Sequence, residues 1–317
     1  MNIFTKIRRH AAIASGNFAS MFKGAEIPAP PAAVARLVTE VNKPEPDMDQ
    51  LTKLVSASPG LAAKVIKTVN SSLFAVRTPV TNVKHAATLL GLKNMRSIAL
   101  AYATMGLLPK PKAQIYDGDA FWTDSLLRAM LARSLAKKTH PDDLEDAFTA
   151  GLLADVAVPV LLSSWRSYYR PIIREWKRKN TRLSKLERNH FGWDHAQAGA
   201  FILQSWDFPE EMVAYTGAHN LTWKKICKLD LADTIVAPLA VATYLPSVLK
   251  PSRKRFERMY SSAIEWLDMS HEEFAECADE VRHSFGEFID VFDLNEEIAD
   301  GVMRHLASAA TTEPAKE

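Results

Sequence analysis

The apolar residues of this chain recur at intervals of three and four positions, which is the period of an amphipathic helix. One such stripe contains Leu61, Val65 and Val69. It follows the pair Ser58-Pro59, which is typical of a helix start because serine can cap the first turn and proline fits the first helical position. The pattern therefore predicts a helix that begins at this pair.

The same period continues along most of the chain. Thr81 is expected to cap the next helix and Gly91 to end it, because glycine readily adopts the backbone conformation that follows a helix. We find no convincing period-two segment of the kind that a half-buried strand shows, and no internal repeat. The predicted fold class is all-α. Further helices are expected over residues 92–105, 119–138, 143–163, 165–179, 195–206, 209–219, 231–248 and 271–292.

The pattern divides the chain into four parts. Residues 1–26 are predicted to form an amphipathic basic helix that packs on the protein's own core or on a second subunit, as in a homodimer, or that lies reversibly on a membrane surface. A proline-rich entry opens the main domain, residues 27–225. Residues 226–306 form a C-terminal helical extension, interrupted by a basic segment at 250–258, and residues 307–317 look frayed.

Composition narrows the class of protein. The chain has 317 residues, of which 47% are hydrophobic, so it can bury a sizeable core. Lysine plus arginine (39) nearly balances aspartate plus glutamate (37), so no global field directs the molecule toward nucleic acid or lipid. Cys227 and Cys277 are too few for a disulfide framework or a zinc cluster. With neither a signal peptide nor a transmembrane segment recognised, a cytoplasmic location is expected.

Common catalytic motifs are missing from the sequence. It has no glycine-rich phosphate loop, no serine nucleophile elbow and no paired-cysteine metal motif. His271-Glu272 lacks the second histidine of a zinc-protease helix. Most classes of enzyme therefore lose support.

Several spaced fragments, read together, resemble the HDOD family, a non-catalytic relative of the HD and HD-GYP metal-dependent phosphohydrolases. The N-terminal half of that domain is similar to residues 61–74 and 80–94. The hydrolase half is similar to Phe121-Trp-Thr-Asp-Ser, to Ala147-Phe-Thr-Ala-Gly-Leu-Leu-Ala-Asp, and to a third fragment that includes Phe191-Gly-Trp-Asp-His. The resemblance covers residues 27–225 and implies a compact multi-helix domain with an N-terminal helical half, followed by the C-terminal helical extension.

The resemblance also implies where a metal site would lie. In the catalytic relatives, histidines and aspartates hold one or two metal ions, whose charge makes bound water acidic enough to attack a phosphoester. This chain has Asp124 and Ala154 in place of two of the histidines, and Asn220 in place of a third. Asp155, His195 and His219 match other ligands, and Asp233 is the candidate for the last aspartate. The resemblance thus implies a degenerate pocket.

Losing a histidine to a methyl group should weaken a metal site severely, because even changes outside the ligand set cost about 10- to 100-fold. We therefore predict no catalytic residue, no resident metal and no cofactor, although Asp124, Asp155 and Asp233 could hold magnesium weakly. Simpler interpretations also exist. His195 could bond to helix-start backbone, His219 could favour the negative end of a helix dipole, and a buried Asp155 would need a partner.

One stretch is strongly basic. It includes Arg170, Arg174, Lys177, Arg178 and Arg182, and Trp165, Tyr168, Tyr169 and Trp176 interleave with basic residues. Such a mixture could grip phosphates and stack bases, or bind an acidic partner. The simpler interpretation is a solvated basic helix whose aromatic residues point into the core.

The leading functional hypothesis is a non-catalytic regulatory or adaptor protein of bacterial signal transduction. It would act through contacts with separate signalling proteins, in pathways such as motility, biofilm formation or second-messenger control, with the pocket binding at most a ligand. The alternatives are a residual metal-dependent phosphohydrolase, and a protein that binds a nucleotide, a cyclic dinucleotide or nucleic acid without hydrolysis.

Overall fold

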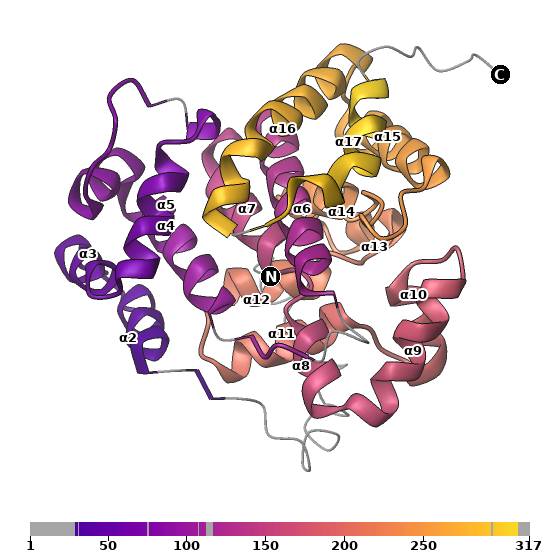
Figure 1. Ribbon diagram of the computed structural model, residues 1–317, viewed down its shortest axis with the longest axis horizontal. Helices are drawn as coiled ribbons and strands as arrows, with labels where there is room; N and C mark the ends of the chain where they lie inside the picture. The colour runs from indigo at the N-terminus through magenta and orange to yellow at the C-terminus, as the bar shows by residue number, and fades with distance from the viewer. Residues whose placement is uncertain are drawn as a thin grey trace.

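The computed structural model describes residues 29–30, 32–74, 76–106, 108–111, 117–292 and 294–309. Within these ranges every regular element is a helix and none is a strand (Figure 1), so the all-α prediction is confirmed. The predicted helix at 1–26 lies outside the described residues. So does most of the predicted C-terminal tail, of which residues 307–309 belong to the last described helix.

The N-terminal half is a group of packed helices at the indigo end of the chain (Figure 1). As predicted, Pro59 occupies the first turn of one of them, although the Ser58 side chain makes no capping bond. The next helix is capped by Asn82 and not by Thr81, because the Asn82 side chain accepts a bond from His85 N. These elements are α2 (Ala32–Val41), α3 (Met48–Ser56), α4 (Pro59–Val69), the short η2 (Ser72–Phe74) and α5 (Val83–Met105).

Gly91 interrupts α5 with a φ of 71° and a ψ of 169°, which lie outside the helical region. Glycine tolerates this positive φ without a steric penalty. Both expected helices therefore form, one before Gly91 and one after it. The glycine produces a kink between them.

The hydrolase half packs beside this group and supplies most of the site. Two of its helices approach each other closely at Gly151, where an added Cβ would lie 2.6 Å from Ala129 Cα, a contact that leaves no room for a side chain. The elements are α6 (Gly118–Thr139), η3 (Pro141–Asp143), α7 (Leu144–Leu153), α8 (Ala157–Ser164), α9 (Arg166–Arg178), α10 (Leu183–Phe191), α11 (His195–Ser205) and α12 (Glu210–Ala218).

The continuous helix expected over 143–163 is wrong, because α7 ends at Leu153 and α8 begins at Ala157. Pro159 has no N–H to donate, so it is tolerated in the first turn of a helix and not in the interior of a longer one. The turn between the two helices carries Asp155. The break therefore gives this aspartate a position that a straight helix would not.

The C-terminal extension shares one hydrophobic core with the rest of the protein, since α14 and α16 pack against α6. Two expectations are corrected here. Only part of residues 231–248 is helical, and the basic segment at 250–258 is largely the start of a helix that Ser252 caps. The elements are α13 (Trp223–Lys228), α14 (Val236–Ala242), α15 (Arg253–Leu267), α16 (His271–Phe292), η4 (Glu296–Ala299) and α17 (Asp300–Ala309).

One stretch of the described residues, Pro141–Ser164, is long and apolar enough to cross a membrane. Its most apolar window is 83% buried inside the protein. Core helices of proteins that cross no membrane have the same property, so this stretch is weak evidence for a span.

Candidate functional site

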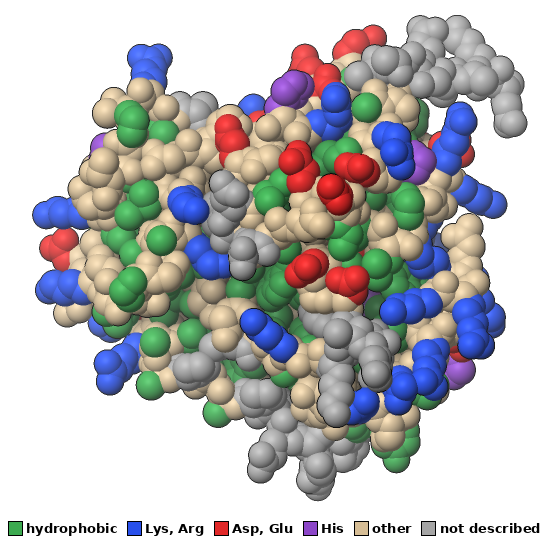
Figure 2. All heavy atoms as spheres, in the orientation of Figure 1, with side chains coloured by type: hydrophobic (Ala, Val, Ile, Leu, Met, Phe, Trp, Pro, Cys, Tyr) green, Lys and Arg blue, Asp and Glu red, His purple; other side chains and the backbone are tan. Residues whose placement is uncertain are grey.

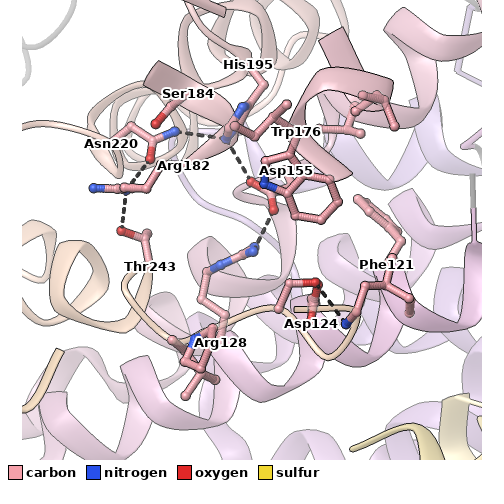
Figure 3. A pocket seen from close by; sticks show the side chains of 18 of the residues that line it. Phe121, Asp124, Arg128, Asp155, Trp176, Arg182, Ser184, His195, Asn220 and Thr243 are labelled. Carbon is pink, nitrogen blue, oxygen red and sulfur yellow. Dashed lines mark hydrogen bonds and ion pairs between the residues drawn. The ribbon is translucent and has the colours of Figure 1, made fainter. Parts of the chain in front are cut away.

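A cavity of about 140 Å³ lies where α6, α10 and α11 meet the segment after α14 (Figure 3). Several predicted site residues line it, together with two arginines from α6 and α15 that the sequence analysis did not select. The polar residues of its wall are Asp117, Asp124, Arg128, Asp155, Lys177, Arg182, Ser184, His195, His219, Asn220, Thr243, Ser247 and Arg255.

Asp155 is the centre of a charged cluster in this cavity. Its Oδ2 lies 2.5 Å from Nη2 of Arg128, and its Oδ1 lies 3.1 Å from Nε2 of His195 and 3.6 Å from Nε2 of His219. Burial opposes ionisation of the carboxyl, but Arg128 and His195 outweigh it and hold the pKa of Asp155 well below its usual range. The partner expected for a buried aspartate is therefore mainly a guanidinium (Figure 3).

His195 begins α11, after an Asp194 cap that accepts bonds from the first turn. The simpler interpretation expected the His195 ring to bond to backbone at the helix start, but the ring contacts two carboxylates instead. Nδ1 lies 2.6 Å from Oε2 of Glu187, and Nε2 faces Asp155. Burial alone would lower the pKa of His195, but the charges of Glu187 and Asp155 outweigh it and raise this pKa to about 10. The ring is therefore a cation at neutral pH, and it donates to both carboxylates.

Glu187 completes this cluster from α10 and is fully buried. It accepts bonds from the His195 ring, from the His195 backbone N–H and from the Tyr169 hydroxyl. Sequence reasoning missed its role because Glu187 stands in a run of basic residues, where a carboxylate resembles an ordinary surface counter-charge.

His219 follows α12 and is also buried. Its Nδ1 donates to the Thr216 carbonyl at 2.7 Å, which satisfies one helix-end acceptor. Burial and then the nearby His195 charge lower the pKa of His219, so the ring is neutral. It contacts the helix end as a neutral hydrogen-bond donor and not as a charge on the helix dipole. Its Nε2 is buried and has no hydrogen-bond partner among the described residues.

Of the remaining predicted site residues, some line the cavity and others do not. Asp124 lines the cavity and accepts a bond from Val248 N at 2.7 Å, and burial raises the pKa of Asp124 to about 6. Asn220 lines it as well, whereas Ala154 is buried behind it. Asp233 is exposed and is not part of the wall, so its predicted place in the pocket is wrong. It lies in a turn before α14, where a continuous helix was expected.

The basic stretch divides in two. Lys177 and Arg182 line the cavity, whereas Arg170, Arg174 and Arg178 do not. Figure 2 shows Lys and Arg side chains gathered at the lower right, where Figure 1 places α9 and α10. The interleaved aromatic residues also divide: Tyr169 is buried, Trp165 packs on Phe191 and Trp193, Trp176 lines the cavity, and Tyr168 is exposed.

Two further arginines were missed. Arg128 stands four residues after Asp124 on α6, a spacing that places both on one helix face. That spacing was the available signal. Arg255 lies in the basic segment that was interpreted as a separator, and only the packing of α15 brings it to the cavity.

The remaining donor set does not fit the two-metal centre of the catalytic relatives. One oxygen of Asp155 and one nitrogen each of His195 and His219 lie within 4.8 Å of one another, so three ligand atoms are in reach of a single ion. That ion would have to displace the proton on His195 and compete with Arg128 for Asp155. Ala154 offers no ligand atom, and a metal bound by these three residues would face additional guanidinium groups on the cavity wall.

Comparison with known proteins gives the family. The model of the HDOD domain matches residues 27–221, which is more than half of the chain. The chain belongs to the HDOD family, as the resemblance in the sequence predicted.

A curated relative, an uncharacterized protein of Treponema pallidum (strain Nichols), is 21% identical over 196 residues. These residues are 62% of this chain and only 38% of the relative, so the chain matches well under half of that protein.

Two solved structures share the fold. The "putative phosphohydrolase" of Shewanella amazonensis SB2B is 22% identical, with a TM-score of 0.58 over 90% of this chain and 95% of that one. The "putative signal transduction protein" of Marinobacter aquaeolei VT8 is 18% identical, with a TM-score of 0.58 over 90% of this chain and 60% of that one. At these identities the likeness concerns the fold alone.

Proposed function

We propose that this protein is a non-catalytic regulator of bacterial signal transduction that acts in the cytoplasm through contacts with partner proteins. The observation that carries the proposal is the 2.5 Å contact between Arg128 Nη2 and Asp155 Oδ2. A guanidinium supplies fixed positive charge to the carboxylate that would otherwise help to hold a metal. Unlike a metal, it has no site for a water and cannot activate one.

Two other positions support the same proposal. Ala154 carries a methyl group at the position where the resemblance implies a histidine ligand in the catalytic relatives. Asn220 uses its amide on protein neighbours, with Oδ1 accepting from Arg182 at 2.6 Å and Nδ2 lying 2.8 Å from His195 Nε2. The groups that remain are thus engaged with one another. Such a cluster can stabilise one arrangement of α6, α10 and α11, and a partner or a ligand could shift it.

Metal analysis and a hydrolysis assay on the same preparation test the non-catalytic part. We expect metal below stoichiometric amounts, and no turnover of a chromogenic phosphodiester with added manganese or magnesium. Stoichiometric metal together with metal-dependent turnover would overturn the proposal. Affinity capture from the native cell tests the adaptor part of the proposal. We expect the natural chain to capture specific signalling proteins, and a pocket variant such as Arg128→Ala to lose them.

A residual phosphohydrolase is the second candidate, because Asp155, His195 and His219 keep three ligand atoms within 4.8 Å. It predicts that metal-dependent turnover disappears in His219→Ala. A higher manganese concentration should not restore that turnover. The matched control is His190→Ala, since His190 is an exposed histidine on α10 outside the cavity.

A further inference from the structure

Two arginines in the cavity wall have no carboxylate partner in an ion pair among the described residues. Arg182 donates from Nη2 to Asn220 Oδ1 at 2.6 Å and to Thr243 Oγ1 at 3.0 Å, and its guanidinium lies over the Tyr244 ring. Arg255 makes one long bond, 3.4 Å, to a backbone carbonyl, and its buried Nε has no hydrogen-bond partner in the described part of the chain. Both groups thus rely on neutral oxygens.

The electrostatics of this wall are correspondingly unfavourable. Burial lowers the pKa of Arg255 to about 10, and repulsion by Arg182 contributes in the same direction. The carboxylates of Asp124 and Asp155 act in the opposite direction, but neither forms an ion pair with Arg255 among the described residues. A buried charge is destabilising unless a counter-charge is close. An anion in the cavity would provide that counter-charge.

A helix start on the same wall points to the same class of ligand. Arg182 precedes α10 and makes no side-chain capping bond, so the first amides of this helix lack the usual side-chain acceptor. Ser184, in its first turn, is 1% exposed, and its Oγ has no hydrogen-bond partner among the described residues. Both residues line the cavity. Helix N-termini favour anions, and a buried hydroxyl without a partner can donate to one.

The size of the cavity limits the ligand. Its volume of about 140 Å³ is close to that of an engineered protein cavity, about 150 Å³, that takes up one benzene molecule. A tetrahedral oxyanion or a small organic acid fits this space.

We propose that the cavity binds a small oxyanion, a phosphate or the carboxylate end of a small acid, between Arg182, Arg255 and Ser184 at the start of α10. The inference rests on the proposed function, because it takes the pocket to bind the anion as a ligand and not to hydrolyse it as a substrate. Phosphate and a carboxylate share the same recognition chemistry: charge-assisted bonds from guanidinium groups, a hydroxyl and helix amides.

The test is calorimetric titration of the full chain, kept metal-free with a chelator, using inorganic phosphate and malonate as probes at constant ionic strength. Thermal unfolding is followed in parallel. We expect saturable binding of at least one probe and a rise in Tm with its concentration. Arg255→Met should weaken that binding about tenfold or more, as loss of a charge-assisted bond does. Arg178→Gln, which removes an exposed arginine outside the cavity, should change it less than about twofold.

Arg255→Met is also informative without ligand. Its Tm should equal or exceed that of the natural chain, because the substitution removes a largely desolvated charge that forms no ion pair among the described residues. A variant that folds and yet binds phosphate normally would overturn the proposal. So would the absence of saturable binding of both probes at millimolar concentration, or tighter binding of a cyclic dinucleotide that depends on Arg255.

The two anion sources are separated by the probes. Preference for phosphate points to a phosphoryl group, and preference for malonate to a carboxylic acid. The outcome is also separable from that of the proposed function. Metal-dependent hydrolysis would overturn the non-catalytic proposal even if metal-free protein bound phosphate. Absence of saturable binding of both probes, with no hydrolysis, would overturn only this inference.

Discussion

The two sides of the cavity are built from similar residues and yet balance their charges differently. On one side, Arg128 and the protonated His195 face the carboxylates of Asp155 and Glu187, with bonds of 2.5 to 3.1 Å. We call these four residues the paired wall, although the fully buried Glu187 does not itself line the cavity. On the other side, which we call the open wall, Arg182 and Arg255 form no ion pair with a carboxylate, and the Ser184 Oγ has no hydrogen-bond partner, among the described residues.

This difference in charge pairing predicts that one wall contributes mainly to the stability of the fold and the other mainly to ligand binding. A buried charge with its partners is costly to disturb, because either partner alone is left uncompensated. A buried charge without partners contributes little to the fold and gains from an external anion. The paired wall should therefore respond to mutation mainly through unfolding, and the open wall mainly through ligand affinity.

The largest effect is expected in the paired wall for Glu187→Ala. This substitution leaves the His195 cation and the Tyr169 hydroxyl without their acceptor. The free energy of unfolding should fall by about 3–5 kcal/mol, as for other broken buried pairs, measured by urea denaturation. Glu257→Ala is the control, because Glu257 pairs with Arg253 on the exposed surface. A loss for Glu187→Ala no larger than the control's would show that the paired wall is not a stabilising cluster.

The second effect concerns the helix contact behind the paired wall. In Gly151→Ala, the new methyl group would overlap the backbone of Ala129, so α6 and α7 must separate. We expect a loss of about 1–3 kcal/mol, as for overpacked cores, in the same urea experiment. Gly286→Ala is the matched control, because its Cβ would meet no atom within 4 Å. Equal stability of the two variants would contradict the close contact.

The third effect is a pH dependence of stability. The pKa of His195 is about 10 when folded and about 6.5 when unfolded, so its charge pairing contributes fully below pH ~6.5 and is lost as pH rises through 10. The stability difference between the natural chain and His195→Gln should therefore shrink between pH 7 and 10. Ring nitrogen NMR shifts should show His195 protonated at pH 8 and His219 neutral. A neutral His195 at pH 7 would remove the paired wall's second cation.

The smallest effect on stability belongs to the open wall. Ser184→Ala removes a buried hydroxyl that has no hydrogen-bond partner among the described residues, so unfolding should change by less than about 0.5 kcal/mol. Phosphate affinity should nevertheless fall several-fold, as measured by calorimetry. A large loss of stability with unchanged affinity would reverse the contrast between the two walls.

Much of the fold was predictable because helix periodicity is a local property. The helix from Pro59, the helix from His271 to Phe292 and the kink at Gly91 follow from residues a few positions apart. The break at Asp155 was missed, although Pro159 was a usable signal. The site was predicted in part: Asp124, Asp155, His195, His219 and Asn220 do line one cavity, whereas Asp233 does not.

The sequence by itself determined the all-α class and the HDOD resemblance, because each depends on residue identity and short-range spacing. Only the tertiary structure decided which charges meet. Arg128, Glu187 and Arg255 come from three helices that are distant along the chain, and whether a charge is paired depends on distances of a few ångströms across helix contacts. Those distances are set by core packing, which helix periodicity does not encode.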